Sequence, residues 1–302
     1  MLSIFVNGVL PVFIMAGLGV LLARSLKINA RPISQLALYL FSPALIFNSL
    51  SSADVSFREV VGIFSFLALW LPLMYLVSWL AGRSSRLTEQ GRSAFMLSTL
   101  FMNAVNYGLP VSLLAFGEAG LQRALLFLVP QSLLAGTLAI YVASRGQAGA
   151  LRGVVTVFRM PTFYATVAAL AINPFHVAFP TAIAEPLKIL SGAAIPTMVM
   201  VLGAQLAYAS WREDLRPAGV ATLLRLVVSP ALAYGVTLAL GIDGLLQQVV
   251  IVLAGMPTAV YTTILATEFN AQPRLVTSSV AMSTGASMLT LTVLIWLVST
   301  LL

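Results

Sequence analysis

Long apolar stretches, each about as long as a membrane span, recur along this chain and constrain its fold more than any other feature. A transmembrane helix needs about 20 consecutive, mostly apolar residues, and ten such stretches are separated by short polar connections. Only 8% of the 302 residues are charged, whereas a typical soluble domain has about 25%. We therefore predict an all-α membrane protein with ten transmembrane helices, near residues 4–23, 33–50, 60–81, 93–116, 121–142, 160–176, 187–208, 218–240, 246–267 and 275–301.

Basic residues in the connections support this count of ten. Lysine and arginine favour the cytoplasmic side of a membrane, and only Arg58, Arg123 and Lys188 lie in the even-numbered connections. The alternation predicts a multi-pass protein of a bacterial cytoplasmic (inner) membrane, surrounded by membrane lipid, with both termini outside. The odd-numbered connections hold thirteen basic residues, which are Arg24, Lys27, Arg31, Arg83, Arg86, Arg92, Arg145, Arg152, Arg159, Arg212, Arg216, the nearby Arg225, and Arg274.

Composition and motifs exclude several other classes of function. The net charge of +7 is carried by basic residues scattered singly through loops, so there is no basic stripe for nucleic acid. The chain has no cysteine, which excludes disulfides, thiolate metal sites and cysteine nucleophiles. It also lacks H-E-x-x-H, G-x-S-x-G and phosphate-loop motifs, which are signatures of common enzyme classes. We therefore expect no enzyme activity, no catalytic or metal-binding residue, and no nucleic-acid partner.

The two halves of the chain are predicted to be repeats of opposite orientation. With five spans in each half, the first half starts outside and the second starts inside, which is the arrangement of inverted-topology transporters. We place the first repeat at residues 1–153 and the second at 154–302. Prolines in corresponding spans of the two halves support this division, and the pairs are Pro43 with Pro196, Pro72 with Pro230, and Pro110 with Pro257.

Spans four and nine are both interrupted by glycine and proline, at "NYGLP" (106–110) and "AGMPTAVY" (254–261). Hydrocarbon cannot satisfy the backbone groups that such breaks free, so both segments must be buried in protein or line a watered cavity. Interrupted spans in equivalent positions of two halves indicate a transporter binding site. Each break exposes a helix N-terminus that carries about half a positive elementary charge. Two such ends near the middle of the membrane favour binding of an anion.

Residues around these breaks are the candidate substrate-binding residues. No aspartate, glutamate or lysine lies in the centre of a predicted span, so a proton relay through buried carboxylates has no evident carrier. In the alternative interpretation, the polar groups only satisfy the broken backbone or join neighbouring helices. The candidates are Asn103, Asn106, Tyr107, Gly108, Pro110 and Gln131 in the first half, and Gly255, Pro257, Thr258 and Tyr261 in the second.

Three stretches resemble a known family, namely "FSPALIFNSL" (41–50), "NAVNYGLPV" (103–111) and "MPTAVYTTILATEFNAQPRLVTSSVAMSTGASMLTLTVL" (256–294). The last of these combines a proline-containing ninth span, a short loop with an acidic and an aromatic residue, and a tenth span rich in serine and threonine. Across nearly its whole length the chain resembles the auxin efflux carrier family, whose bacterial members include malonate and other dicarboxylate permeases. It lacks the long central loop of the plant carriers, since only residues 144–159 join its halves.

The resemblance implies a fold shared with bile acid sodium symporters, made of two inverted five-helix repeats. It implies a scaffold domain of spans one, two, six and seven, which often forms a homodimer, and a transport domain of spans three to five and eight to ten. It also implies that the broken spans four and nine cross, with Asn106 and Pro110 in one arm and Pro257 in the other. The substrate carboxylate is expected to bind beside that crossing.

We therefore expect a secondary transporter that moves a small organic anion, a carboxylate, by alternating access. A sodium-coupled symporter of the bile acid type and an anion channel are the alternatives, and a non-transporting membrane receptor is a third. We expect no organic cofactor. Binding of Na+ is compatible with the sequence, because sodium sites in transporters can be built from backbone carbonyls and from the side chains of Asn, Gln, Ser and Thr, all of which the chain contains.

Overall fold

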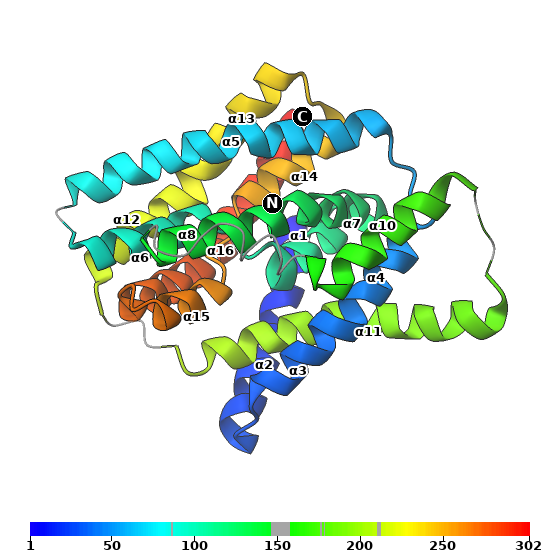
Figure 1. The fold of residues 1–302 in the computed structure, drawn as a ribbon, viewed down its shortest axis with the longest axis horizontal. Helices are drawn as coiled ribbons and strands as arrows, with labels where there is room; N and C mark the ends of the chain where they lie inside the picture. The colour runs from blue at the N-terminus through cyan, green and yellow to red at the C-terminus, as the bar shows by residue number, and fades with distance from the viewer. Residues whose placement is uncertain (86, 146–157, 176, 178, 210–212) are drawn as a thin grey trace.

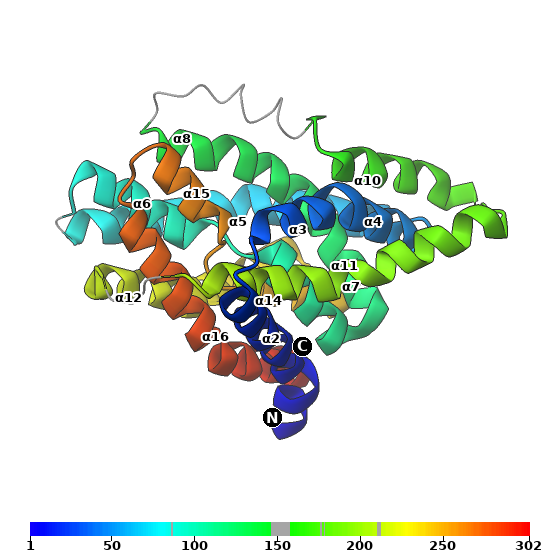
Figure 2. The same ribbon diagram turned by 90° about the horizontal axis from the view of Figure 1, so that it is seen from below.

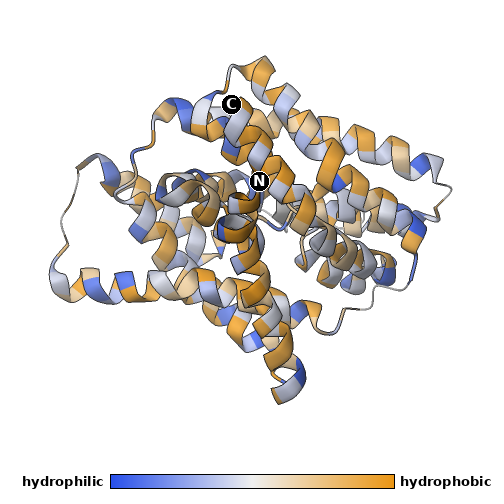
Figure 3. Ribbon diagram, turned by 180° about the vertical axis from the view of Figure 1, so that it is seen from behind, coloured by the Kyte–Doolittle hydropathy of each residue, from blue (hydrophilic) through white to orange (hydrophobic). Residues whose placement is uncertain are grey.

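The computed structural model describes residues 1–302 apart from residues 86, 146–157, 176, 178 and 210–212. The described residues form helices joined by short connections, with no strand among them (Figure 1). The expected all-α class is confirmed. Apolar residues dominate the helices seen from behind (Figure 3), and many large apolar side chains, such as Ile14, Leu76 and Ile189, are exposed. Exposure of this extent is what a lipid environment permits.

Of the first three spans, the second and third begin at capping side chains. The Asn29 side chain accepts a hydrogen bond of 3.0 Å from the backbone N–H of Arg31. Ser56 and Glu59 form a capping box before the third span, in which each side chain satisfies a backbone N–H of the other residue. These spans consist of α1 (Leu2–Ile4), η1 (Phe5–Val9) and α2 (Leu10–Leu26), then α3 (Ala30–Leu36), η2 (Ala37–Phe41) and α4 (Ser42–Leu50), then α5 (Phe57–Ser84).

Both spans that the sequence predicts to be interrupted are interrupted in the structure, but the first break lies at residues 101–103 and not at the predicted 106–110, where the chain is helical. Helix α6 (Glu89–Leu100) ends before residues 101–103, and η3 (Ala104–Gly108) leads into α7 (Leu109–Leu134). Within α7, Gly117 has a φ of 67°, which glycine adopts without steric cost, so the chain kinks between predicted spans four and five. The remaining elements of these regions are η4 (Ala135–Ala139), α8 (Ile140–Ala143), α14 (Gly244–Ala254) and α15 (Tyr261–Glu268).

The other helices of the second half pack against those of the first. Helix α11 crosses α2, and α13 packs along α5 (Figure 1). Helix α10 lies alongside α4 (Figure 2), and α1 contacts α16, which brings the two termini to one side of the molecule. The bounds are α10 (Pro161–Ile172), η5 (Asn173–Phe175), α11 (Thr181–Leu206), α12 (Leu215–Leu223), η6 (Leu224–Val228), α13 (Ser229–Leu240) and α16 (Pro273–Leu301).

Four segments of π-helix each lie just before a proline. In each, the residue before the proline donates its N–H to a carbonyl five residues earlier, as Leu109 does to Ala104 and Ser229 to Leu224. Proline lacks an N–H and crowds the carbonyl four residues before it, and the extra residue of a π turn relieves that crowding. The helix therefore continues past each proline, and the pairs are η1 with Pro11, η2 with Pro43, η3 with Pro110 and η6 with Pro230.

By length and apolarity, seven of the described helices can cross a membrane, which is fewer than the ten predicted. The second part of predicted span four and all of predicted span five fall within one stretch of 40 residues, Ala104–Ala143, while the first part of span four lies in α6. Predicted spans six and nine are represented by short helices, α10 with 12 residues and α14 with 11. The count of ten, the inverted repeats and the outside position of the termini stay predictions. The predicted boundary between residues 153 and 154 lies outside the described residues.

Helices α2 and α11 cross at two glycines that bring their backbones into contact. A Cβ atom added to Gly19 would lie 2.3 Å from the carbonyl oxygen of Met200, and one added to Gly203 would lie 1.9 Å from the carbonyl oxygen of Ala16. Such distances are shorter than any van der Waals contact. Small residues that let helix backbones approach are a main source of helix association in membranes, so this crossing depends on both glycines.

Substitution of Gly19 by alanine is therefore expected to destabilise the protein. The added methyl group forces the two helices apart, and overpacking of this kind costs about 1–3 kcal/mol, or roughly 3–10 °C in melting temperature. Thermal unfolding of the purified protein in detergent measures the effect. Gly17→Ala on the same helix is the control, because Gly17 is exposed and nothing lies within 4 Å of an added Cβ. Equal melting temperatures for the two variants would contradict the close contact.

Candidate functional site

The two interrupted segments pair with each other through their backbones. Met102 and Thr258, one from each break, form an isolated antiparallel bridge. The N–H of Asn103 donates to the carbonyl of Pro257 at 2.8 Å, and the N–H of Ala259 donates to the carbonyl of Phe101 at 2.9 Å. Both bridge residues are buried. Segments about 150 positions apart in the sequence therefore supply each other with the hydrogen bonds that hydrocarbon would not.

Side chains from neighbouring helices fix this backbone pair. The Thr258 hydroxyl donates to the carbonyl of Ser98 at 2.7 Å, and the N–H of Thr258 donates to the Ser283 hydroxyl at 3.1 Å. The Gln131 amide donates to the carbonyl of Met102 at 3.3 Å. Thr258 and Gln131 therefore satisfy backbone groups of the breaks, which was the alternative interpretation of these two residues.

Arg225 in η6 is fully buried and binds the carbonyl ends of both interrupted helices. Its Nη1 donates to the carbonyls of Thr99, at 2.8 Å, and Leu100, at 3.4 Å, at the end of α6. Its Nε donates to the carbonyl of Met256 at 3.0 Å, and its Nη2 donates to the carbonyl of Ala254 at the end of α14. One guanidinium thus covers the C-terminal ends of α6 and α14.

Two further residues complete the surroundings of this guanidinium. Its Nη2 donates to the Ser229 hydroxyl at 2.9 Å, and its central carbon lies 5.5 Å from the centre of the Trp70 ring. The Trp70 indole N–H donates to the carbonyl of Ser229 at 3.3 Å. The assignment of Arg225 to a cytoplasmic connection was therefore wrong. Twelve basic residues remain in the odd-numbered connections, so the charge asymmetry is kept.

The N-terminal ends of the two broken helices line a single cavity. It has a volume of about 510 Å³, and its wall includes Ala104–Asn106 at the start of η3 and Ala259–Tyr261 at the start of α15. The first N–H groups of a helix have no partner within it. No Asp, Glu, Lys or Arg is among the described residues that line the cavity, so the helix ends are its main source of positive potential.

Several polar atoms in the cavity wall have no hydrogen-bond partner among the described residues. They are the Asn103 Nδ2, the Tyr261 Oη, the Gln205 Oε1 and the Ser34 Oγ atoms, all of which are buried. A buried polar atom without a partner costs about 1–3 kcal/mol, so a cavity that gathers four of them favours a polar ligand. The rest of the wall is mostly apolar.

Four of the ten candidate residues line this cavity, namely Asn103, Asn106, Gln131 and Tyr261. The other six lie outside its lining and build the region around the backbone pair. The Tyr107 hydroxyl accepts a hydrogen bond of 3.0 Å from Ser287, and a Cβ added to Gly255 would lie 2.4 Å from a methyl group of Leu294. Gly108, Pro110, Pro257 and Thr258 are buried. Whether any of the ten binds substrate stays a prediction.

Comparison with known proteins identifies the family. The family described as "Membrane transport protein" matches residues 4–295. The chain belongs to this family. It is 29% identical over 265 residues to an uncharacterized transporter of Methanothermobacter thermautotrophicus, covering 87% of each chain. It is also 26% identical over 280 residues to an uncharacterized transporter of Methanocaldococcus jannaschii, covering 89% of this chain and 90% of the other. The resemblance to the auxin efflux carrier family is confirmed.

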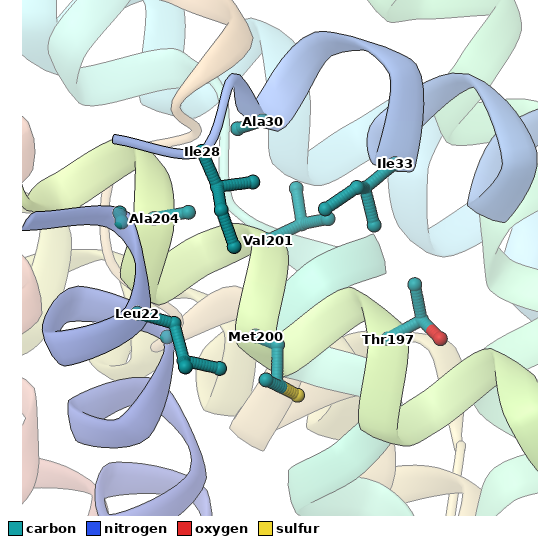
Figure 4. Close-up of a pocket in the computed structure, with 10 residues that line it drawn as sticks. Leu22, Ile28, Ala30, Ile33, Thr197, Met200, Val201 and Ala204 are labelled. Atoms are coloured by element: carbon teal, nitrogen blue, oxygen red, sulfur yellow. The ribbon is translucent and has the colours of Figure 1, made fainter. Parts of the chain in front are cut away.

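A second, smaller cavity in this membrane transport protein offers a less suitable site. It has a volume of about 180 Å³ and lies between α2, α3 and α11, as Figure 4 shows. The side chains that line it are almost all apolar, among them Leu22, Ile28 and Met200, and Thr197 is the only one with a hydroxyl among the described lining residues. An organic anion would find little to bind there.

Sequence reasoning missed three residues of this transporter's site. Arg225 was missed although its position falls inside the predicted eighth span, 218–240, where a charged side chain indicates function or a specific partner. Gln205 was not among the candidates, because a buried amide more safely indicates contact with a neighbouring helix. Ser34 carries no pattern that distinguishes it, because it lies near the start of a span, where serine is common.

The Thr258 hydroxyl is expected to stabilise the transporter by holding the break against α6. Thr258→Val keeps the shape of the side chain and leaves the Ser98 carbonyl without its donor, which costs about 1 kcal/mol or more. Thermal unfolding in detergent should show a lower melting temperature. Thr267→Val is the control, because this exposed hydroxyl bonds only to the carbonyl four residues earlier. A Thr258→Val protein as stable as the control would show that the bond contributes nothing.

Proposed function

We propose that the protein is a secondary transporter that carries a small organic anion, a carboxylate, across the cytoplasmic membrane by alternating access. The observation that supports this most is the arrangement of the broken helices. Their N-terminal ends line one cavity, whereas their C-terminal ends are bound by Arg225 on the other side of the backbone pair. An anion is the natural ligand for two helix N-termini.

The amount of charge favours a ligand that presents one carboxylate to the site. Each helix N-terminus is equivalent to about +0.5 elementary charge, so two together match about one negative charge. The unpartnered Asn103 amide and Tyr261 hydroxyl supply donors for the carboxylate oxygens. The largely apolar remainder of the wall suits the hydrocarbon part of the same molecule, as is usual in ligand cavities.

The polar contacts of the protein support a division into two moving parts. In the proposed ten-span arrangement, spans one, two, six and seven form the scaffold, which is the expected homodimer contact, and the other spans form the transport domain. Scaffold helices bond to one another, as when Arg24 and Tyr208 bind the carbonyls of Ala207 and Ala23. The crossing is bonded to η6, α7 and α16 of the transport domain, and α5 is bonded to the carbonyl of Ser229 at the start of α13. The cavity lies between these groups, where few polar bonds would resist sliding.

The cavity reaches the side of the protein that carries the basic connections, which supports an inward-facing state. Its wall includes Ser34, three positions after Arg31, and Met160, which directly follows Arg159. At the opposite end of the second span, the Ser49 hydroxyl donates to Glu118 at 2.9 Å, and the Gln122 side chain donates to the Ser49 carbonyl. These bonds join the proposed scaffold and transport domain on the outer side.

An anion channel remains the second candidate, because helix N-termini also form ion filters. Reconstituted protein distinguishes the two. Liposomes preloaded with unlabelled benzoate should take up radiolabelled benzoate faster than empty ones, because a carrier returns loaded, whereas a channel gains nothing from substrate on the far side. Radiolabelled malonate tests whether a second carboxylate is tolerated. Saturable binding without flux of either anion would instead support a receptor.

The Tyr261 hydroxyl is expected to bind the carboxylate. Tyr261→Phe removes a hydroxyl that has no protein partner, so stability should not fall, but the KM for benzoate should rise roughly tenfold, the value of one hydrogen bond to a charged group. Tyr107→Phe is the matched control, because its hydroxyl bonds to Ser287 and lies outside the cavity. A higher KM in Tyr107→Phe with no change in Tyr261→Phe would contradict the proposed site and place it near Tyr107 instead.

The absence of cysteine from the chain makes the inward-facing state directly testable. Ser132 lines the cavity and Ser112 is fully buried. Without substrate, Ser132→Cys should react with a membrane-impermeant thiol reagent in inside-out vesicles and only slowly in intact cells, while Ser112→Cys should stay unreactive in both. Faster reaction of Ser132→Cys from the outside would reverse the proposed orientation.

A further inference from the structure

Arg225 is a buried charged side chain that the proposed anion site does not use. It does not line the 510 Å³ cavity, so it cannot bind a substrate held there. Yet it is fully buried, and no carboxylate is among its bonded partners. These partners are the Ser229 hydroxyl and four backbone carbonyls, those of Thr99, Leu100, Ala254 and Met256. A buried charge needs compensation, and here oxygen dipoles provide it.

The compensation comes from helix ends and is close to complete. The C-terminus of a helix is equivalent to about −0.5 elementary charge, and α6 and α14 both end at this guanidinium. Two such ends sum to about −1, which the single positive charge of Arg225 neutralises. The planar fork of five N–H donors reaches carbonyls of both chain segments at once, which an ammonium group with three donors cannot do equally well.

Half-helix C-termini and unwound backbone carbonyls are the groups with which transporters of inverted-repeat type coordinate an exchangeable cation. In this protein the same kind of oxygen cluster already binds the guanidinium of Arg225. The carbonyls of Thr99, Ala254 and Met256 all face the guanidinium, and Ser229, which also donates to the carbonyl of Ala254 at 2.5 Å, completes the shell. A metal ion bound to these oxygens would lie beside the positive charge of the guanidinium, so it would have to displace Arg225.

We propose that the Arg225 guanidinium is a built-in cation that holds the two broken helices together and takes the position of an exchangeable coupling ion, so that the crossing needs no Na+. Arg225 is accordingly a positioning residue for the anion site. By covering the negative helix ends on one side of the backbone pair, it fixes the geometry in which the positive ends of η3 and α15 face the cavity on the other side.

The test is chemical rescue. Arg225→Ala removes the donor from four carbonyls and from the Ser229 hydroxyl, so its melting temperature in detergent should fall well below that of the wild type, and millimolar guanidinium chloride should restore part of the loss. Tetramethylammonium chloride, which has the charge but no N–H donor, should not restore it. Arg216→Ala is the matched control, because Arg216 is exposed on α12, in the same span, and it should show neither the loss nor the rescue.

Arg225→Lys keeps the charge and covers the case in which Arg225→Ala does not fold. It should be less stable than the wild type, and it should gain from added guanidinium less than Arg225→Ala does. A lysine variant as stable as the wild type would overturn the proposal that the fork is needed, and so would an alanine variant that guanidinium and tetramethylammonium rescue equally.

The sodium arm uses the wild type alone and rests on the proposed transport function. Benzoate flux in liposomes, and the melting temperature in detergent, should be the same in sodium and in choline chloride. A stabilising effect of sodium on the wild type would overturn the inference. If neither benzoate nor malonate moves in any medium, the proposed function fails, whereas the rescue of Arg225→Ala still decides the role of the guanidinium.

Discussion

The rest of the structure depends on how the backbone groups freed at two helix breaks are satisfied away from water. A broken helix in a membrane exposes N–H groups at one end and carbonyls at the other, and hydrocarbon can satisfy neither. This chain pairs the two breaks with each other, through Asn103 with Pro257 and Ala259 with Phe101. The groups that this pairing leaves over decide where a ligand can bind.

The leftover groups are sorted by charge. The carbonyl ends of α6 and α14 meet at Arg225, while the N–H ends of η3 and α15 meet at the cavity. One side of the backbone pair is therefore occupied by the Arg225 guanidinium, and the other side faces the cavity, where we propose that an anion binds. If both sides were open, the site would need two ligands of opposite charge, and if both were closed, it would bind none.

The sequence predicted the features that follow from local chemistry. Glycine and proline at 106–110 and 254–261 indicated which spans are interrupted, because these residues act on their own helix, and the apolar stretches indicated membrane helices for the same reason. The first break nevertheless lies at residues 101–103, because the π turn of η3 lets the helix continue past Pro110. The π segments before Pro43 and Pro230 belong to this local class, although they were not predicted.

The features that were missed depend on contacts between distant segments. Arg225 was assigned to a loop because its charge fitted the pattern of the connections, and only the fold shows that α6 and α14 both end at its side chain. Likewise, Asn103 and Thr258 look equivalent in sequence, as polar residues beside a break. In the structure Thr258 bonds to Ser98 and Asn103 keeps an unpartnered amide at the cavity.

The same distinction supports the proposed movement of the crossing as one unit. Bonds between the breaks, and from the breaks to Arg225 and Ser283, join these residues into one unit, to which Trp70 is joined through the carbonyl of Ser229. The surface between that unit and α3, α4, α10 and α11 is instead largely the apolar cavity wall. Dispersion contacts between apolar side chains are individually weak and non-directional, so two packed positions of the unit can differ little in free energy. A rigid polar centre bounded by an apolar surface is thus suited to carry a bound anion from one side of the membrane to the other.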